Sequence, residues 1–267
     1  MAEFNYQGHQ VVYEQTGEGP DLVLVHGFCE DRRMWADFQQ PFTQQYRVLT
    51  FDLPGFGESS IAGKLSIQNF AELLKALLDE LKITSCVLLG HSMGGYIGVA
   101  FAELYPDMLS GLGFFHSHVY ADTEEKKSAL SKSVEFVERN GSVPYVGQVI
   151  PSLFAEAFAQ ANPDLIADLV TEAHAYPAAG VINALEAMRD RPDRSAVLKE
   201  LDIPVLFILG KEDQAIPYEA SITQTVLPQI AQVELMEHVG HMGMFEALKQ
   251  TQTQWWNFLH LVALNRN

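Results

Sequence analysis

The sequence predicts an α/β protein in which helices flank a mainly parallel central sheet. Short runs rich in Val, Leu, Ile and Phe, each the length of a buried strand, recur along the chain. Helical patterns separate several of these runs, and strands that alternate with helices usually pair in parallel. The length of 267 residues and the hydrophobic content of 48% fit one globular domain with room for an insertion.

The expected strands and helices follow from these patterns in chain order. Residues 4–12 and 14–20 resemble two strands, with Tyr13 and the glycines near residue 18 marking their connection. A helix is predicted over 66–81, where leucines recur at helical spacing and Ser66 can cap the first turn. A second helix is predicted over 95–105, ended by Pro106. The later strands are expected at residues 22–25, 46–51, 86–89, 111–115, 205–209 and 232–236.

The alternation of strands and helices stops after Phe115. Helical patterns alone follow, at 123–140, 143–154, 163–174 and 177–190. We therefore predict a helical cap over 117–195, inserted into a core formed by 1–116 and 196–267. A simple run of covering helices remains the alternative. The charged residues 124–127 are expected to form an exposed helix face.

Composition limits the partners and the location. The formal charge is −17, and a surface this acidic repels nucleic acid and anionic lipid, so neither partner is expected. No apolar run is long enough to span a bilayer, and the start lacks the pattern of a secretory signal. Cys29 and Cys86 cannot form a disulfide framework, which fits the cytoplasm. The expected partner is a small-molecule substrate, and the oligomeric state is not predicted.

The strongest local motif is Gly90-His91-Ser92-Met93-Gly94, which satisfies G-x-S-x-G. It directly follows a predicted strand and directly precedes a predicted helix, as a nucleophile elbow requires. This turn would expose Ser92 at the carboxyl edge of the sheet, and the helix N-terminus would favour a developing negative charge there. Ser92 is therefore the candidate nucleophile.

A serine hydroxyl needs a base, and an acid must orient that base. Asp213 comes just after the strand 205–209, with Glu212 as its rival. His241 follows the strand 232–236 and a glycine, with His238 as the competing base. The order serine, acid, histidine is the one expected for this elbow.

Five motifs in this order make the chain resemble the α/β-hydrolase superfamily. They are His26-Gly27-Phe28, the loop from Asp52 to Ser59, Gly90–Gly95, Gly210–Asp213 with Pro217, and Gly240-His241 with Glu246. The resemblance selects Asp213 over Glu212 and His241 over His238. It also implies an oxyanion hole formed by the backbone N–H groups of Phe28 and Met93.

The resemblance implies a serine hydrolase that cleaves a small to medium, partly apolar carboxylic ester through an acyl-enzyme, without a cofactor or metal. Other reactions remain alternatives for the same residues: hydrolysis of a lactone, hydrolysis of a carbon–carbon bond, and perhydrolase or lyase chemistry. A ligand receptor that retains the triad is the alternative from another class. His26 and His91 are expected to hydrogen-bond loops, and His116 and His118 to line the pocket rim rather than bind a metal.

Overall fold

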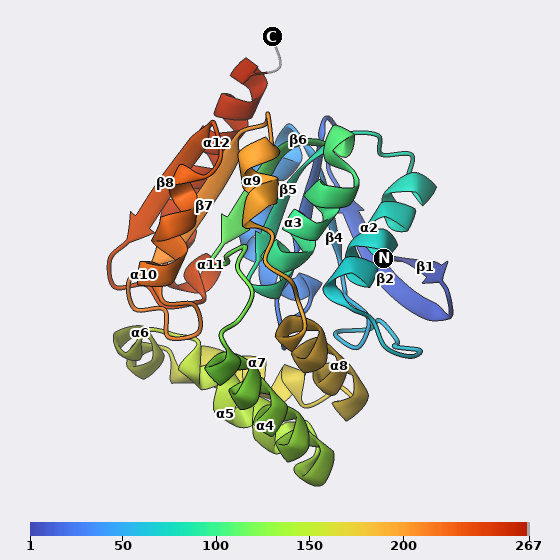
Figure 1. The fold of residues 1–267 in the computed structure, drawn as a ribbon, viewed down its shortest axis with the longest axis vertical. Helices are drawn as coiled ribbons and strands as arrows, with labels where there is room; N and C mark the ends of the chain where they lie inside the picture. The colour runs from blue at the N-terminus through green and yellow to red at the C-terminus, as the bar shows by residue number, and fades with distance from the viewer. Residues whose placement is uncertain (266–267) are drawn as a thin grey trace.

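The computed structural model describes residues 1–265 and contains one eight-stranded sheet between layers of helices (Figure 1). The strand order is β1-β2-β4-β3-β5-β6-β7-β8. The strands from β4 to β8 in this order pair in parallel, and β1 and β2 complete the sheet as antiparallel strands. The strands are β1 (Ala2–Tyr6), β2 (His9–Thr16), β3 (Asp21–Val25), β4 (Arg47–Phe51), β5 (Cys86–His91), β6 (Leu109–Phe115), β7 (Val205–Gly210) and β8 (Ala231–Met236). The predicted α/β class and the six predicted later strands are confirmed.

The prediction for the opening hairpin was wrong. The connection lies at Gln7 and Gly8, between the paired residues Tyr6 and His9. Both turn residues have positive φ, 50° and 90° respectively, as a two-residue type I′ turn requires. Tyr13 lies inside β2, where it pairs with Phe51 of β4.

Helices cover both faces of the sheet. A side chain at Gly98 of α3 (Met93–Leu104) would touch Leu112 of β6. A side chain at the adjacent strand residue Gly111 would instead touch Phe258 of α12 (Leu248–Asn265). Because successive strand residues point to opposite faces, α3 and α12 lie on opposite sides of the sheet. Both faces of β5 are buried, which explains its continuous apolar run.

The helix predicted after Ser66 is confirmed as α2 (Ile67–Glu80). The Ser66 side chain accepts a hydrogen bond from the backbone of Asn69, and the Asn69 side chain accepts one from the backbone of Ser66. This reciprocal cap fixes the start of the helix. Shorter helices complete the flanks: α1 (Ala36–Gln39), α9 (Ser195–Glu200), α10 (Tyr218–Ser221) and α11 (Gly243–Glu246).

Between β6 and β7 the chain forms helices only, and these helices gather beyond one end of the sheet (Figure 1). They are α4 (Glu124–Asn140), α5 (Val143–Ser152), α6 (Glu156–Ala161), α7 (Pro163–Ala173) and α8 (Ala178–Arg189). The four predicted helices are confirmed, and α6 is an additional one. No helix within residues 1–265 combines the length and apolar character needed to cross a bilayer.

Candidate active site

A strained turn presents Ser92 at the carboxyl end of β5. The strand ends at His91 and α3 begins at Met93, so Ser92 is the single residue between them. Its φ of 49° with ψ of −116° lies in a region that non-glycine residues seldom occupy and that costs on the order of 1–3 kcal/mol. A side chain at Gly90 would overlap the backbone of Gly94, and a side chain at Gly94 would overlap the carbonyl oxygen of Val25, which accounts for both glycines of the motif.

The Asp213 carboxylate is fixed by three hydrogen bonds. Its Oδ1 accepts from the backbone N–H groups of Ala215 (2.9 Å) and Ile216 (2.8 Å). Its Oδ2 lies 2.7 Å from Nδ1 of His241. The backbone N–H of His241 donates to the Leu153 carbonyl at 2.7 Å, which anchors the histidine loop. The imidazole is therefore oriented from both its ring and its main chain.

This pairing shifts both pKa values. Burial by itself raises the pKa of Asp213, but the charge and hydrogen bond of His241 outweigh burial and lower it. Burial lowers the pKa of His241, and the Asp213 carboxylate, with a contribution from Glu30, more than offsets this and raises it. Asp213 thus stays ionised and favours the protonated form of its histidine partner.

Ser92 and His241 line the same cavity of about 140 Å³. Apolar side chains from the helices between β6 and β7 form much of its wall, including Leu130, Tyr145 and Met188. The rival residues lie elsewhere: Glu212 is half-buried and His238 is exposed, and their side chains hydrogen-bond each other at 3.1 Å. Neither rival lines the cavity.

The loop that carries Phe28 lies directly against Ser92. A side chain at Gly27 would approach the Ser92 Cβ to 3.0 Å. Within residues 1–265, no other group accepts a hydrogen bond from the backbone N–H of Phe28 or of Met93. Both amides are therefore available to an oxygen atom bound beside Ser92.

Glu30 joins the Phe28 loop to the serine turn and the histidine loop. Its Oε2 accepts from the backbone N–H of Gly27 (2.6 Å) and lies 2.9 Å from Nδ1 of His91. The His91 Nε2 lies 2.8 Å from the carbonyl oxygen of His241. Both ring nitrogens of His91 face acceptors, so both bonds form together only when each nitrogen carries a proton. Sequence reasoning missed Glu30, although the loop-bonding role expected for His91 is confirmed.

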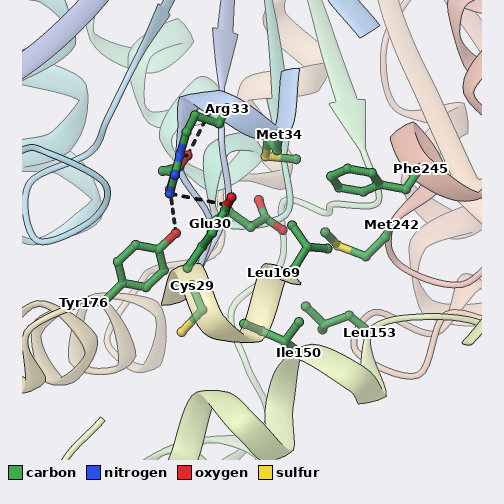
Figure 2. Close-up of a pocket in the computed structure, with 12 residues that line it drawn as sticks. Cys29, Glu30, Arg33, Met34, Ile150, Leu153, Leu169, Tyr176, Met242 and Phe245 are labelled. Carbon is green, nitrogen blue, oxygen red and sulfur yellow. Dashed lines mark hydrogen bonds and ion pairs between the residues drawn. The ribbon is translucent and has the colours of Figure 1, made fainter. Parts of the chain in front are cut away.

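A second cavity of about 200 Å³ is lined in part by the loop that carries Phe28 and Glu30 (Figure 2). Its wall combines apolar residues such as Met34, Leu169 and Phe245 with the charged residues Glu30, Asp31, Arg33 and Glu172. Arg33 pairs with Asp31, which also accepts a hydrogen bond from the Tyr176 hydroxyl at 2.8 Å. Leu153 lines both cavities and lies between them.

The expectation for His116 and His118 was wrong, because neither lines the cavity at Ser92. His116 is buried behind Asp213, with its Nδ1 at 3.6 Å from the Asp213 Oδ2. Burial lowers its pKa well below the ordinary value, and it stays neutral. His118 packs on the Tyr96 ring, and burial lowers its pKa to about 4. Within residues 1–265, no cluster of three His, Cys, Asp or Glu side chains is arranged to hold a metal ion.

Lys126 is exposed, as expected for this helix face, but it also lines the cavity beside Ser92, together with the charged residues Asp122 and Arg191. The signal that could have indicated this is its place in the first turn of a helix, where a basic residue is unfavourable.

A family model described as the alpha/beta hydrolase fold matches residues 20–248. The chain belongs to the α/β-hydrolase family. Over 242 residues, this α/β-hydrolase is 33% identical to a putative carbamate hydrolase, RutD, of Pseudomonas syringae, covering 85% of this chain and 88% of the relative. It is 29% identical to Lipase 1 of Psychrobacter immobilis, covering 97% of this chain and 83% of that lipase.

Solved structures agree with this assignment. A thermophilic esterase from Thermogutta terrifontis superposes with a TM-score of 0.90 at 30% identity, and the match covers 97% of each chain. An enol-lactonase from Burkholderia xenovorans superposes equally well, with a TM-score of 0.90, but at 22% identity shows the shared fold alone. The relatives named as esterases, lipases and hydrolases establish that this α/β-hydrolase is a hydrolytic enzyme.

Proposed function

We propose that this α/β-hydrolase is a serine hydrolase that cleaves a small to medium, partly apolar carboxylic ester through an acyl-enzyme. One observation carries the proposal. Ser92, held at a strained turn, lines the same cavity as His241, whose imidazole is paired with Asp213. A nucleophile, a base and an acid that orients the base are the parts that acyl transfer by serine requires.

The proposed mechanism follows from these roles. Ser92 attacks the carbonyl carbon while His241 Nε2 takes the hydroxyl proton, and Asp213 stabilises the resulting imidazolium. The N–H groups of Phe28 and Met93 donate to the oxyanion. His241 then protonates the departing alcohol, which leaves Ser92 acylated. Water deprotonated by His241 releases the carboxylic acid and restores the serine.

We also propose that residues 117–195 act as a cap on a catalytic core formed by 1–116 and 196–267. In support, cavity-lining side chains come from α4, α5 and α8, whereas Ser92 and His241 come from the core. The cytoplasm remains the proposed location, because Cys29 and Cys86 are both buried and form no disulfide, as suits a reducing compartment.

A panel of p-nitrophenyl esters of increasing chain length, together with lactones, tests the proposed activity. We expect turnover of esters with an optimum at a short or medium acyl chain, because the cavity is small and mostly apolar. Turnover of lactones alone would favour the lactonase alternative. Ligand-dependent stabilisation without turnover of any member would favour a receptor and contradict the proposal.

Met188 is expected to set the preferred chain length. It is buried in the wall of the cavity at Ser92, so Met188→Ala should lengthen the preferred acyl chain. One methylene in an apolar pocket changes discrimination by about 1–3 kcal/mol. The measurement is kcat/KM across the ester series.

Phe158→Ala is the matched control. The Phe158 ring stacks on Phe154 at 5.6 Å between ring centroids, and neither side chain lines the cavity at Ser92. This control should keep the wild-type preference. An unchanged preference in Met188→Ala would show that Met188 contributes packing only.

The pH dependence should reflect the pair of His241 and Asp213. A general base acts in its neutral form, and the Asp213 carboxylate keeps the pKa of His241 above its ordinary value. The profile of kcat/KM should therefore fall on the acid side with an apparent pKa above about 6.5. An acid limb below this value would contradict the proposed pairing in the working enzyme.

A further inference from the structure

The cavity at Ser92 contains charged side chains that the proposed mechanism does not use. Lys126 comes from the start of α4, Asp122 from the segment just before it, and Arg191 from just beyond α8. All three line the same cavity as the serine and the histidine. The side chains of Asp122 and Arg191 are largely buried, so each of them needs a partner, whereas Lys126 is exposed to solvent and can stay charged without one.

Arg191 and Asp122 neutralise each other. The guanidinium makes two hydrogen bonds to the Asp122 carboxylate, each of 2.7 Å. It also donates to the Met188 carbonyl and stacks on the Tyr96 ring at 3.9 Å. Such a two-point pair is rigid, and it adds no net charge to the cavity.

Lys126 has no such counter-charge. Its ammonium donates to the carbonyl oxygen of Ala215 at 2.8 Å, in the loop that follows Asp213. It takes part in no ion pair within residues 1–265. Because an ammonium has three N–H donors, two remain for another acceptor. The three charges therefore sum to one positive charge within reach of the substrate.

The position of Lys126 is unfavourable for the helix itself. Thr123 caps α4 and accepts a hydrogen bond from the backbone N–H of Lys126, which makes Lys126 the third helical residue. In a capping box this position holds Glu or Gln, and a cation there opposes the helix dipole. Of the charged residues in this first turn, Glu124 and Glu125 do not line the cavity, so Lys126 is the one that brings positive charge to it, in a chain whose formal charge is −17.

We propose that the substrate carries a carboxylate remote from the scissile ester, and that Lys126 binds this carboxylate. The inference rests on the proposed function, since it concerns the same cavity and the same reaction. The apolar wall would hold the chain between the two ends of the substrate. Lys126 is a specificity residue in this account and takes no part in bond cleavage.

Two pairs of esters of matched chain length test this inference. Monomethyl adipate and methyl hexanoate differ by a carboxylate in the acyl part, and 4-acetoxybutanoate and butyl acetate differ by one in the alcohol part. For at least one pair, Lys126→Met should lower the ratio of kcat/KM for the acidic ester to that for the neutral ester by about tenfold or more, the effect of losing a charged hydrogen bond. Lys126→Glu should lower the ratio further.

Lys127→Met is the matched control, because Lys127 pairs with Glu124 and does not line the cavity. It should leave both ratios unchanged. If Lys126 only holds α4 to the Ala215 loop, its replacement will reduce activity on both members of each pair equally, and unchanged ratios overturn the inference. The proposed function survives that result if the neutral esters are hydrolysed and Ser92 reacts with a fluorophosphonate. Loss of both in the wild type would overturn the two proposals together.

Discussion

Replacing Ser92 with alanine is expected to abolish ester hydrolysis. In the proposed mechanism the hydroxyl forms the acyl-enzyme, and no other side chain within residues 1–265 occupies the turn between β5 and α3. Loss of the nucleophile from a triad of this kind lowers kcat by about a million-fold. The measurement is kcat on the best ester of the panel for wild type and variant.

Two checks make the Ser92→Ala result specific. Alanine relieves none of the backbone constraints at this turn, so circular dichroism and the thermal midpoint should remain close to wild type. Ser152→Ala, at an exposed residue whose hydroxyl bonds the Val149 carbonyl, should retain full activity. A Ser92→Ala variant that kept more than a few per cent of wild-type activity would exclude Ser92 as the nucleophile.

The second large effect is expected for Asp213→Asn. The two backbone N–H groups of Ala215 and Ile216 would hold the asparagine oxygen where Oδ1 now lies. The asparagine NH₂ group would then face His241 Nδ1 and force the ring proton onto Nε2. An imidazole in this tautomer cannot accept the serine proton, and the expected loss in kcat is about ten-thousand-fold.

Glu212→Gln is the matched control for Asp213→Asn, because the Glu212 carboxylate does not line the cavity and hydrogen-bonds the exposed residue His238. It should lose little activity. The same comparison applies to the base, where His241→Ala should be inactive and His238→Ala close to wild type. The assignment of Asp213 as the acid fails if Glu212→Gln is inactive and Asp213→Asn is active.

Local signals predicted much of the fold. Ser66 with Asn69 marks the start of α2, and the buried runs of β5 and β7 are unmistakable because both of their faces are covered. The opening hairpin was misplaced because its turn is Gln-Gly, which lacks the usual asparagine or aspartate signal, whereas the glycines at 17 and 19 suggested a turn further on. Those glycines instead lie against the backbone of residues 43–46.

The candidate site was only partly predictable. The nucleophile elbow is formed by consecutive residues, whereas the residues that surround it come from distant parts of the chain. Glu30 meets His91 across 61 positions of the chain, a contact that no local pattern contains. Large apolar side chains of the helices between β6 and β7 also illustrate this. Met188 lines the cavity, whereas Phe154 and Phe158 stack on each other away from it. Composition and periodicity mark such residues as apolar, but the packing of the helices decides which of them face the substrate.

Trapping the acyl-enzyme is the most direct test of Ser92 as the nucleophile. The wild type would be mixed with a slowly deacylated ester, quenched in acid within milliseconds to seconds, digested, and mapped by mass spectrometry. The proposed mechanism predicts an acyl adduct on Ser92 that forms within one turnover, decays with the release of acid, and is absent from Ser92→Ala. An adduct on a different residue, or steady turnover with no adduct at Ser92, would contradict it.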